Sequence, residues 1–184
     1  PNLFSGTGNF TVPIATTPGR GGFGPALSLQ YSTGSGSSPF GLGWELSIPR
    51  ITRKTEKGLP RYDDTDVFVL SGAEDLVVAD SQPPYPTPGH KVKRYRPRTE
   101  GLFARIERWE SDIDRNSVHW RVTTRDNVTS IYGKSAAARI TDPDAKHRIY
   151  QWLLEESYDP KGNHILYQYA AEPDELALRG LHER

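Results

Sequence analysis

The sequence predicts an all-β protein, an antiparallel meander of about ten or more short strands. Short segments alternate between apolar and polar residues with a period of two, which places successive side chains on opposite faces of a strand. Clusters of Gly, Pro, Ser and Asp separate these segments, and the 17 glycines and 15 prolines supply tight turns. Four Trp, nine Tyr and six Phe give a curved sheet large side chains for one buried face, while the other face meets water.

The glycine-rich opening, residues 6–55, is the stretch around which this prediction is organised. Its three alternations are carried by Phe10, Val12 and Ile14, by Leu27, Leu29 and Tyr31, and by Trp44, Leu46 and Ile48. We expect three strands whose apolar side chains are buried, and we expect the rest of the chain to extend the same sheet. The turn and core candidates of this stretch are Gly6, Gly8, Gly19, Gly21, Gly24, Gly41, Gly43 and Trp44.

The next part of the chain predicts a hairpin and a loop. A polar alternating segment over residues 50–57 precedes an acidic turn at residues 62–66. Residues 67–70 and 76–79 then predict the two strands of a hairpin. The segment 81–89 contains four prolines, which cannot donate ladder hydrogen bonds, so it predicts an extended surface loop. We interpret this loop as an insertion rather than a domain boundary, because the strand pattern resumes directly after it.

From Val92 the pattern predicts a continuous meander, with a turn at residues 112–117. In the strand after that turn, Val118, Trp120 and Val122 share one face. The strands of this part are expected at residues 101–109, 118–124, 128–133, 138–141 and 148–158.

The last hairpin is the most informative local unit of the sequence. Its turn, residues 159–163, joins the strand at 148–158 to an alternation that begins at Ile165. Pro160 presets φ for the turn and Gly162 supplies the positive φ that ends it, so Gly162 and Asn163 are turn candidates. After the hairpin, residues 172–183 predict a short helix or a frayed end.

Composition and charge exclude several classes of function. Lys+Arg and Asp+Glu number 23 each, so no net field attracts nucleic acid or an anionic membrane. Cysteine is absent, which removes disulfides and thiolate metal ligands. The sequence has neither an apolar run of about 20 residues nor a signal peptide. Methionine is absent even at position 1, and we expect a fragment of a longer chain.

Several motifs imitate binding sites, and each has a structural alternative that we prefer. Residues 19–24 match GxGxxG, but a dinucleotide site needs a following helix and here Pro25 and a strand pattern follow, so we predict a turn and no cofactor. Residues 112–116 imitate a calcium loop, but Ser117 stands where Gly is required. We predict a hairpin turn there and no metal.

Three other groups of polar residues also suggest binding sites: an acidic turn, a basic run and the histidines. The acidic turn at Asp63, Asp64 and Asp66 could bind calcium weakly, although such turns are common before strands. The basic run from Lys91 to Arg98 imitates a nucleic-acid stripe, yet alternation sends its charges to both faces, and Glu100, Glu107 and Glu110 are near enough in sequence to pair with them. We therefore predict an ion-paired or solvated edge strand. The five histidines show neither metal spacing nor a catalytic order.

A family resemblance is carried by many ordered motifs, among them the runs 18–25, 40–44, 63–68, 95–106 and 158–163. In these positions the sequence resembles the N-terminal domain shared by the Salmonella virulence plasmid B protein family and the B components of insecticidal toxin complexes. The resemblance extends to about Tyr169. It implies a β domain over residues 1–170, followed by a poorly defined tail over residues 171–184. Residues 158–163 also resemble one unit of the tyrosine–aspartate repeats of Rhs-type proteins, which suggests that further units follow.

The resemblance implies a non-catalytic structural and delivery module of a secreted bacterial toxin, made in the cytoplasm before export. Its sheet would form part of a curved shell that encloses a C-terminal cytotoxic payload, with A-type and C-type toxin components as partners. The alternative is a secretion module, or a module that binds a glycan or protein through its tryptophans, attached to a separate effector such as an ADP-ribosyltransferase. That enzyme class needs a Glu-x-Glu motif, and none occurs in this sequence.

Overall fold

The computed structural model describes residues 8–38, 40–56, 58–71, 75–80, 87–98 and 103–170. Within them the chain forms fifteen strands and two short 3-10 segments, which confirms the predicted all-β class. The first strands are β1 (Asn9–Ile14), β2 (Leu27–Ser32), β3 (Ser37–Ser38), β4 (Gly41–Leu42), β5 (Trp44–Leu46), β6 (Arg50–Arg53), β7 (Phe68–Leu70) and β8 (Asp75–Asp80). The others are β9 (His90–Pro97), β10 (Ala104–Ser111), β11 (Val118–Thr124), β12 (Thr129–Tyr132), β13 (Arg139–Thr141), β14 (Ile149–Tyr158) and β15 (His164–Leu166). The 3-10 segments are η1 (Arg20–Gly22) and η2 (Ala136–Ala138).

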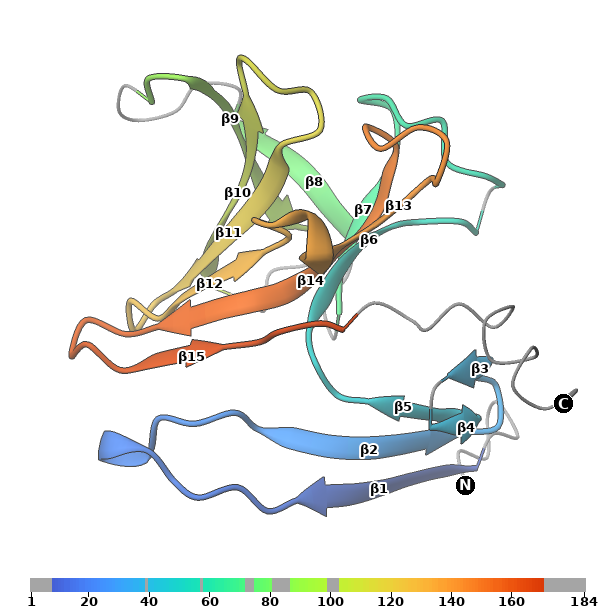
Figure 1. Ribbon diagram of the computed structural model, residues 1–184, viewed down its shortest axis with the longest axis vertical. Coiled ribbons are helices and arrows are strands. Elements are labelled where there is room, and N and C mark those ends of the chain that lie inside the picture. Colours follow the sequence, from blue (N-terminus) through green and yellow to red (C-terminus); the bar gives the residue numbers. More distant parts are fainter. Residues whose placement is uncertain are drawn as a thin grey trace, which may run out of the picture.

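The main sheet is a meander that closes into an eight-stranded barrel (Figure 1). Strands β6 to β12 pair in sequence order, each antiparallel to the next. Strand β14 closes the barrel because it is long enough to pair with both ends of the meander. Its residues Gln151 to Leu153 pair with β6, and its residues from Leu154 to Tyr158 pair with β12. The predicted meander is therefore present, and it curves until its two ends meet.

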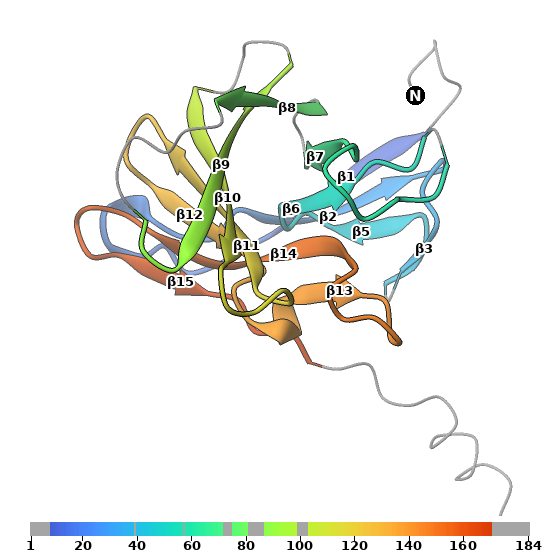
Figure 2. The same cartoon turned by 90° about the horizontal axis from the view of Figure 1, so that it is seen from above.

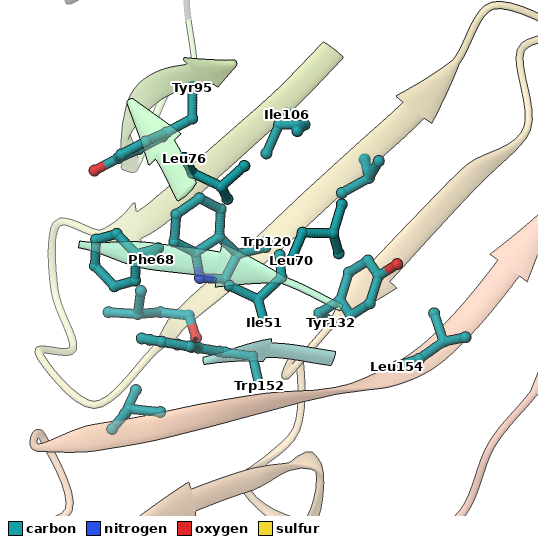
Figure 3. Close-up of a cluster of buried hydrophobic side chains, with 13 residues drawn as sticks. Ile51, Phe68, Leu70, Leu76, Tyr95, Ile106, Trp120, Tyr132, Trp152 and Leu154 are labelled. Carbon is teal, nitrogen blue, oxygen red and sulfur yellow. Dashed lines mark hydrogen bonds between the residues drawn. The ribbon is translucent and has the colours of Figure 1, made fainter. Parts of the chain in front are cut away.

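Large apolar side chains fill the barrel. Because side chains alternate across a strand, one residue in two from each strand points inward. The ring of Phe68 lies 4.9 Å from that of Trp120 and 5.8 Å from those of Tyr95 and Trp152, centroid to centroid (Figure 3). Trp120 and Trp152 are completely buried, and Val118 and Val122 share the inner face with Trp120, as the sequence predicted.

A second sheet, made of β1, β2 and β5, lies beside the barrel, below β15 in Figure 1 and partly behind β6 and β14 in Figure 2. The prediction that the chain continues one sheet is wrong at this point. The chain bends after β5, where Ile48 N donates to the carbonyl of Leu46 at 2.8 Å and Pro49 follows, and β6 starts the barrel. The prediction that the apolar side chains of the opening are buried is wrong for β1, since Phe10 is 62% exposed and Val12 and Ile14 are each 37% exposed. The apolar side chains predicted for the other two strands are partly buried.

One further prediction is wrong, and others concern residues that lie outside the described part of the chain. Strand β9, which contains the basic run, is not an edge strand, because it lies between β8 and β10. The helix predicted over residues 172–183 and most of the proline-rich segment 81–89 lie outside the described residues, as does the whole tail over residues 171–184. The domain division at residue 170 stays a prediction.

Candidate functional site

One mouth of the barrel is lined by charged residues that surround a cavity of about 280 Å³. Arg53, on β6, is only 4% exposed. Its guanidinium donates to the Ile149 carbonyl at 2.8 Å and to the Asp66 carboxylate at 2.7 Å. Burial, and next the positive charge of Arg108, lower the pKa of Arg53, whereas Asp66 opposes that shift. A buried guanidinium needs this carboxylate, because an uncompensated buried charge is strongly destabilising.

A second guanidinium, that of Arg108 on β10, lies on the same core ring. The Cζ atoms of Arg53 and Arg108 lie 4.9 and 5.3 Å from the centroid of Phe68. Arg108 pairs with Glu110 at 3.0 Å and with Asp64 at 3.4 Å. The mouth is therefore held together by paired opposite charges that cap an aromatic core.

The acidic turn at residues 62–66 is held against this mouth by its carboxylates. The Asp66 carboxylate accepts hydrogen bonds from the backbone N–H groups of Arg61 (3.0 Å) and Tyr62 (2.8 Å), as well as from Arg53. Asp63 accepts from the backbone and hydroxyl of Thr65, and Asp64 from Lys93 at 2.6 Å. The three carboxylates that the sequence suggests as weak calcium ligands therefore all accept hydrogen bonds from the protein itself.

The basic run on β9 is paired in a similar way. Lys93 binds Asp64, Arg98 lies 3.4 Å from Asp75, and Arg94 lies 3.8 Å from Glu107. Glu107 is the partner that the sequence predicted, whereas Glu110 pairs with Arg108 instead and Glu100 lies outside the described residues. The run is therefore bound to neighbouring strands rather than gathered into one cationic stripe.

The glycines of the turn around η1 are explained by the backbone conformation and by close contacts. Gly21, in η1, has φ of +64°, which favours glycine. A Cβ on Gly19 would overlap the carbonyl oxygen of Phe23, so the loop closes only around glycine there. Gly24 packs against the nitrogen of Gly19. The residues of the GxGxxG match thus form a turn followed by β2, with no helix N-terminus to receive a phosphate.

The glycines of the second turn support the aromatic face of the small sheet. Gly43 is buried at φ +81°, and a Cβ there would lie 2.6 Å from Cε2 of Tyr31. Gly41, at φ +106°, has Cδ1 of Trp44 at 4.0 Å from the position of its missing Cβ. Trp44 is half-buried, with its ring 5.3 Å from Tyr31 and 6.4 Å from Phe10. Close approach of the Tyr31 ring needs glycine at position 43, whereas at position 41 the positive φ alone favours glycine.

The remaining turn candidates lie at two other places. Gly8 and Thr33 exchange two hydrogen bonds of 3.2 Å, which join the start of β1 to the end of β2. In the β14–β15 turn, Gly162 has φ of +81°, and the Asp159 carboxylate accepts from Lys161 N (2.9 Å), Asn163 N (2.9 Å) and Asn163 Nδ2 (2.7 Å). Gly6 lies outside the described residues. A functional role for any of these candidates stays a prediction.

The structure also brings together three residues that the sequence kept apart. His90, Trp109 and His119 come from three adjacent strands and meet on the outer face of the barrel. The Trp109 and His119 rings stack at 5.9 Å, and the two imidazole centroids are 6.1 Å apart. Burial, and then the charge of Arg121, lower the pKa of His119 to about 4. The signal was available only through the strand register, which places Trp109 opposite His119.

No set of three or more His, Cys, Asp or Glu side chains converges in the described part of the chain in a way that could hold a metal ion. The same part of the chain contains no helix long and apolar enough to cross a bilayer.

The described residues thus define an antiparallel β-barrel module with an ion-paired mouth and an appended apolar sheet. The model of the Salmonella virulence plasmid 65kDa B protein family matches residues 2–183, and the chain belongs to this family. The match continues past Tyr169, where the motif-by-motif resemblance ends.

Relatives in this family are named as enzymes, but the chain matches only part of them. Mono(ADP-ribosyl)transferase SpvB of Salmonella typhimurium (strain 14028s / SGSC 2262) is 38% identical over 189 residues, which cover 95% of this chain and 32% of the relative. SpvB of Salmonella dublin gives the same identity and coverage. The chain therefore spans about a third of the length of these relatives.

Solved structures place the fold in toxin complexes as well. The N-terminal domain of effector protein SpvB from Salmonella typhimurium strain LT2 is 38% identical, with a TM-score of 0.79 over 89% of this chain and 55% of that one. The Photorhabdus luminescens Tc holotoxin pore structure gives 39% identity and a TM-score of 0.83 over 92% of this chain and 8% of that one. A crystal structure of TcdB2–TccC3 matches with a TM-score of 0.82. The resemblance inferred from the sequence is confirmed.

Proposed function

We propose that this chain is a non-catalytic structural and delivery module of an exported bacterial toxin, and that it forms part of a β-sheet shell around a C-terminal cytotoxic payload. The observation that carries the proposal is the match, at 39% identity, to chains of Tc toxin structures of which this domain is 8%. An all-β domain that is a small part of a much longer chain is suited to building one section of a wall. Its partners would be the A-type and C-type toxin components and the enclosed payload.

The physical character of the barrel supports a structural role. Its interior is filled by rings and its mouth by paired charges, so the large buried surfaces stabilise the fold. Three of the five basic residues of the run pair with Asp64, Asp75 and Glu107, which argues against nucleic acid as a partner. The Asp and Glu side chains of the mouth are held by arginines and backbone N–H groups, which leaves them poorly placed to transfer protons to a substrate.

Protection of the payload tests the shell. The complete polypeptide is assembled with its C-type component, with and without residues 8–170, and exposed to trypsin. We expect the payload to survive in the assembly that contains the domain and to be digested in the one that lacks it. Equal survival in both would show that the domain is not part of the wall. A parallel assay with NAD and an acceptor protein should show no turnover by the 184-residue chain, and measurable turnover would overturn the non-catalytic assignment.

The second candidate is a secretion or binding module attached to a separate effector. The observation that favours it is the 38% identity to proteins named mono(ADP-ribosyl)transferase, of which this chain covers 32%. Trp44 and Trp109 are half-buried and are the tryptophans with area left for a glycan ring, whereas Trp120 and Trp152 are buried. Quenching of tryptophan fluorescence by one member of a glycan panel, lost in Trp44→Ala or Trp109→Ala, would support this candidate.

The reading frame around the domain separates the two candidates. Further Tyr-Asp-x-x-Gly-Asn units after residue 163 would support the shell. A proline-rich linker followed by a Glu-x-Glu transferase would support the delivery module and contradict the shell.

A further inference from the structure

The β1–β2–β5 sheet carries a continuous apolar face. Cross-strand register aligns Phe10 with Tyr31 and Trp44 in one row and Val12 with Leu29 and Leu46 in the next. Ile14 and Leu27 complete a third row. The Tyr31 hydroxyl is the single ionisable group in these rows, so the face is suited to an apolar or aromatic partner and not to a charged one.

Apart from Leu46, which lies beside the barrel at the end of β5, this face points away from the barrel. The alternate residues Gln30 and Glu45 line a cleft of about 490 Å³ together with Thr52 and Val69 of the barrel strands. Glu45 also forms an ion pair with Arg50 at the start of β6. Since side chains alternate across a strand, Leu29, Tyr31 and Trp44 project to the opposite side.

Among the described residues, Tyr169 and Leu153 meet the apolar face at Leu46, and the rest of the face is half-buried or exposed. Every residue of β1 is exposed, and no residue of β2 or β5 is buried. A sheet with one hydrophobic face is stable only when that face is buried against another element. The sheet is nevertheless well formed, with Ser47 Oγ bonded to Ser28 N at 2.8 Å and to Ser28 Oγ at 2.9 Å. A well-formed sheet whose apolar face is exposed or only half-buried indicates a docking surface.

We propose that this face docks an apolar, β-rich segment of the same polypeptide, outside these 184 residues. The solved N-terminal domain of Salmonella SpvB supports the choice, because this chain accounts for only 55% of it and the rest of that domain is available as cover. Tyr169 adds a second argument. It lines an apolar cleft of about 360 Å³ with Phe40 and Leu46, so the polypeptide that leaves the barrel passes beside the small sheet.

A second copy of the chain fits less well. Among the described strands, β1 pairs with β2 alone, and its free edge would be the natural site for pairing with another β1. Pro13, the fifth of the six residues of β1, has no N–H to donate, so a ladder between two copies would lack a hydrogen bond there. The inference holds whether the polypeptide builds a shell or carries a separate effector, and its failure leaves the proposed function untouched.

Hydrogen exchange of two polypeptides tests the proposal. One is the 184-residue chain, and the other is the natural polypeptide extended to the length of the Salmonella N-terminal domain. We expect the amides of β1 and β2 to exchange about 10-fold more slowly in the longer polypeptide, while barrel amides exchange equally in both. Equal exchange of β1 and β2 in the two polypeptides would overturn the proposal.

Matched double variants assign the effect to the face. Val12→Asp with Leu29→Asp places two charges on the apolar face, and we expect it to abolish the slower exchange. Thr11→Asp with Gln30→Asp places the same charges on a cross-strand pair of the opposite face and should preserve it. Near-ultraviolet circular dichroism of both double variants is the control for a folded barrel. Should the charged variant fail to fold, the nearly isosteric Val12→Thr provides the test through a partial loss of protection.

Light scattering distinguishes the second copy. We expect the 184-residue chain to be monomeric at micromolar concentration. A dimer that Val12→Asp with Leu29→Asp converts to monomer would identify another copy as the occupant and overturn the proposal.

Discussion

The barrel and the β1–β2–β5 sheet are built from the same kinds of strand, but their apolar side chains have different surroundings. In the barrel, alternating residues such as Trp120 and Trp152 are completely buried, because closure of the sheet gives each strand an interior. In the small sheet, Phe10 shows the same alternation and is 62% exposed. The difference teaches that alternation creates an apolar face, whereas burial depends on a second surface to cover it.

Tryptophan removal should give the largest contrast between the two regions. Trp152→Ala leaves a cavity at the centre of the barrel and also removes the hydrogen bond from its Nε1 to the Val118 carbonyl at 2.8 Å. We expect a loss of about 3–5 kcal/mol in the free energy of unfolding. Trp44→Ala should cost less, about 1–2 kcal/mol, because its ring is only partly buried. Denaturant titration measures both, and similar losses would show that the small sheet shares the core's cooperativity.

Glycine substitution should give the next largest effect. A Cβ on Gly133, at φ +67°, would lie 3.0 Å from Cβ of Trp152 and would overlap its Cδ1. We expect Gly133→Ala to cost about 3 kcal/mol, from backbone strain together with overpacking. Gly162→Ala is the matched control, since it has φ of +81° and open space around it, and should cost about 1 kcal/mol. Thermal unfolding measures the pair, and equal losses would contradict the close packing at Gly133.

Acidification should weaken the barrel through His119. Its pKa is about 4 in the folded chain, below the ordinary value of 6.5, because of burial and then Arg121, His90, Arg139 and Lys134. Below pH 6.5 the unfolded chain takes up a proton that the folded chain refuses until about pH 4, so stability falls as the pH falls through this range. We expect a loss of about 2 kcal/mol between pH 7 and pH 5.

The variant His119→Gln assigns the pH effect. It should flatten this part of the stability profile, whereas His147→Gln, at an exposed position, should leave the profile unchanged. An unaltered pH dependence in His119→Gln would mean that another group is responsible.

The smallest expected effect concerns the independence of the small sheet. Ser47→Ala removes the bonds to Ser28 that join β5 to β2. We expect local opening of the small sheet to become easier by about 1 kcal/mol, while the midpoint of barrel unfolding stays the same. Hydrogen exchange resolves the two regions, and Ser130→Ala, which removes a 3.0 Å contact with Ser157 between β12 and β14, is the corresponding change in the barrel. A shift in the midpoint of barrel unfolding in Ser47→Ala would show that the two sheets unfold as one cooperative unit.

Local pattern was sufficient for much of the fold. The positions of β7 and β8, the inward face of β11 and the turn around Gly162 follow from alternation and turn chemistry, which act between residues close in sequence. The resemblance of the runs at 18–25 and 158–163 was sufficient for the family. Nearby sequence also pointed to Glu107 as one of three candidate partners of the basic run, and it lies 3.8 Å from Arg94.

Other features were decided by tertiary structure alone. Closure of the barrel joins Trp152 of β14 to Ile51 of β6, a pairing across about half of the chain that no local pattern encodes. Pairing with both β8 and β10 makes β9 an interior strand rather than the expected edge, and strand register brings His90 close to His119. The sequence by itself determined which residues share a face. Which faces are covered depended on contacts between distant strands, because burial is a property of the assembled surfaces and not of any one segment.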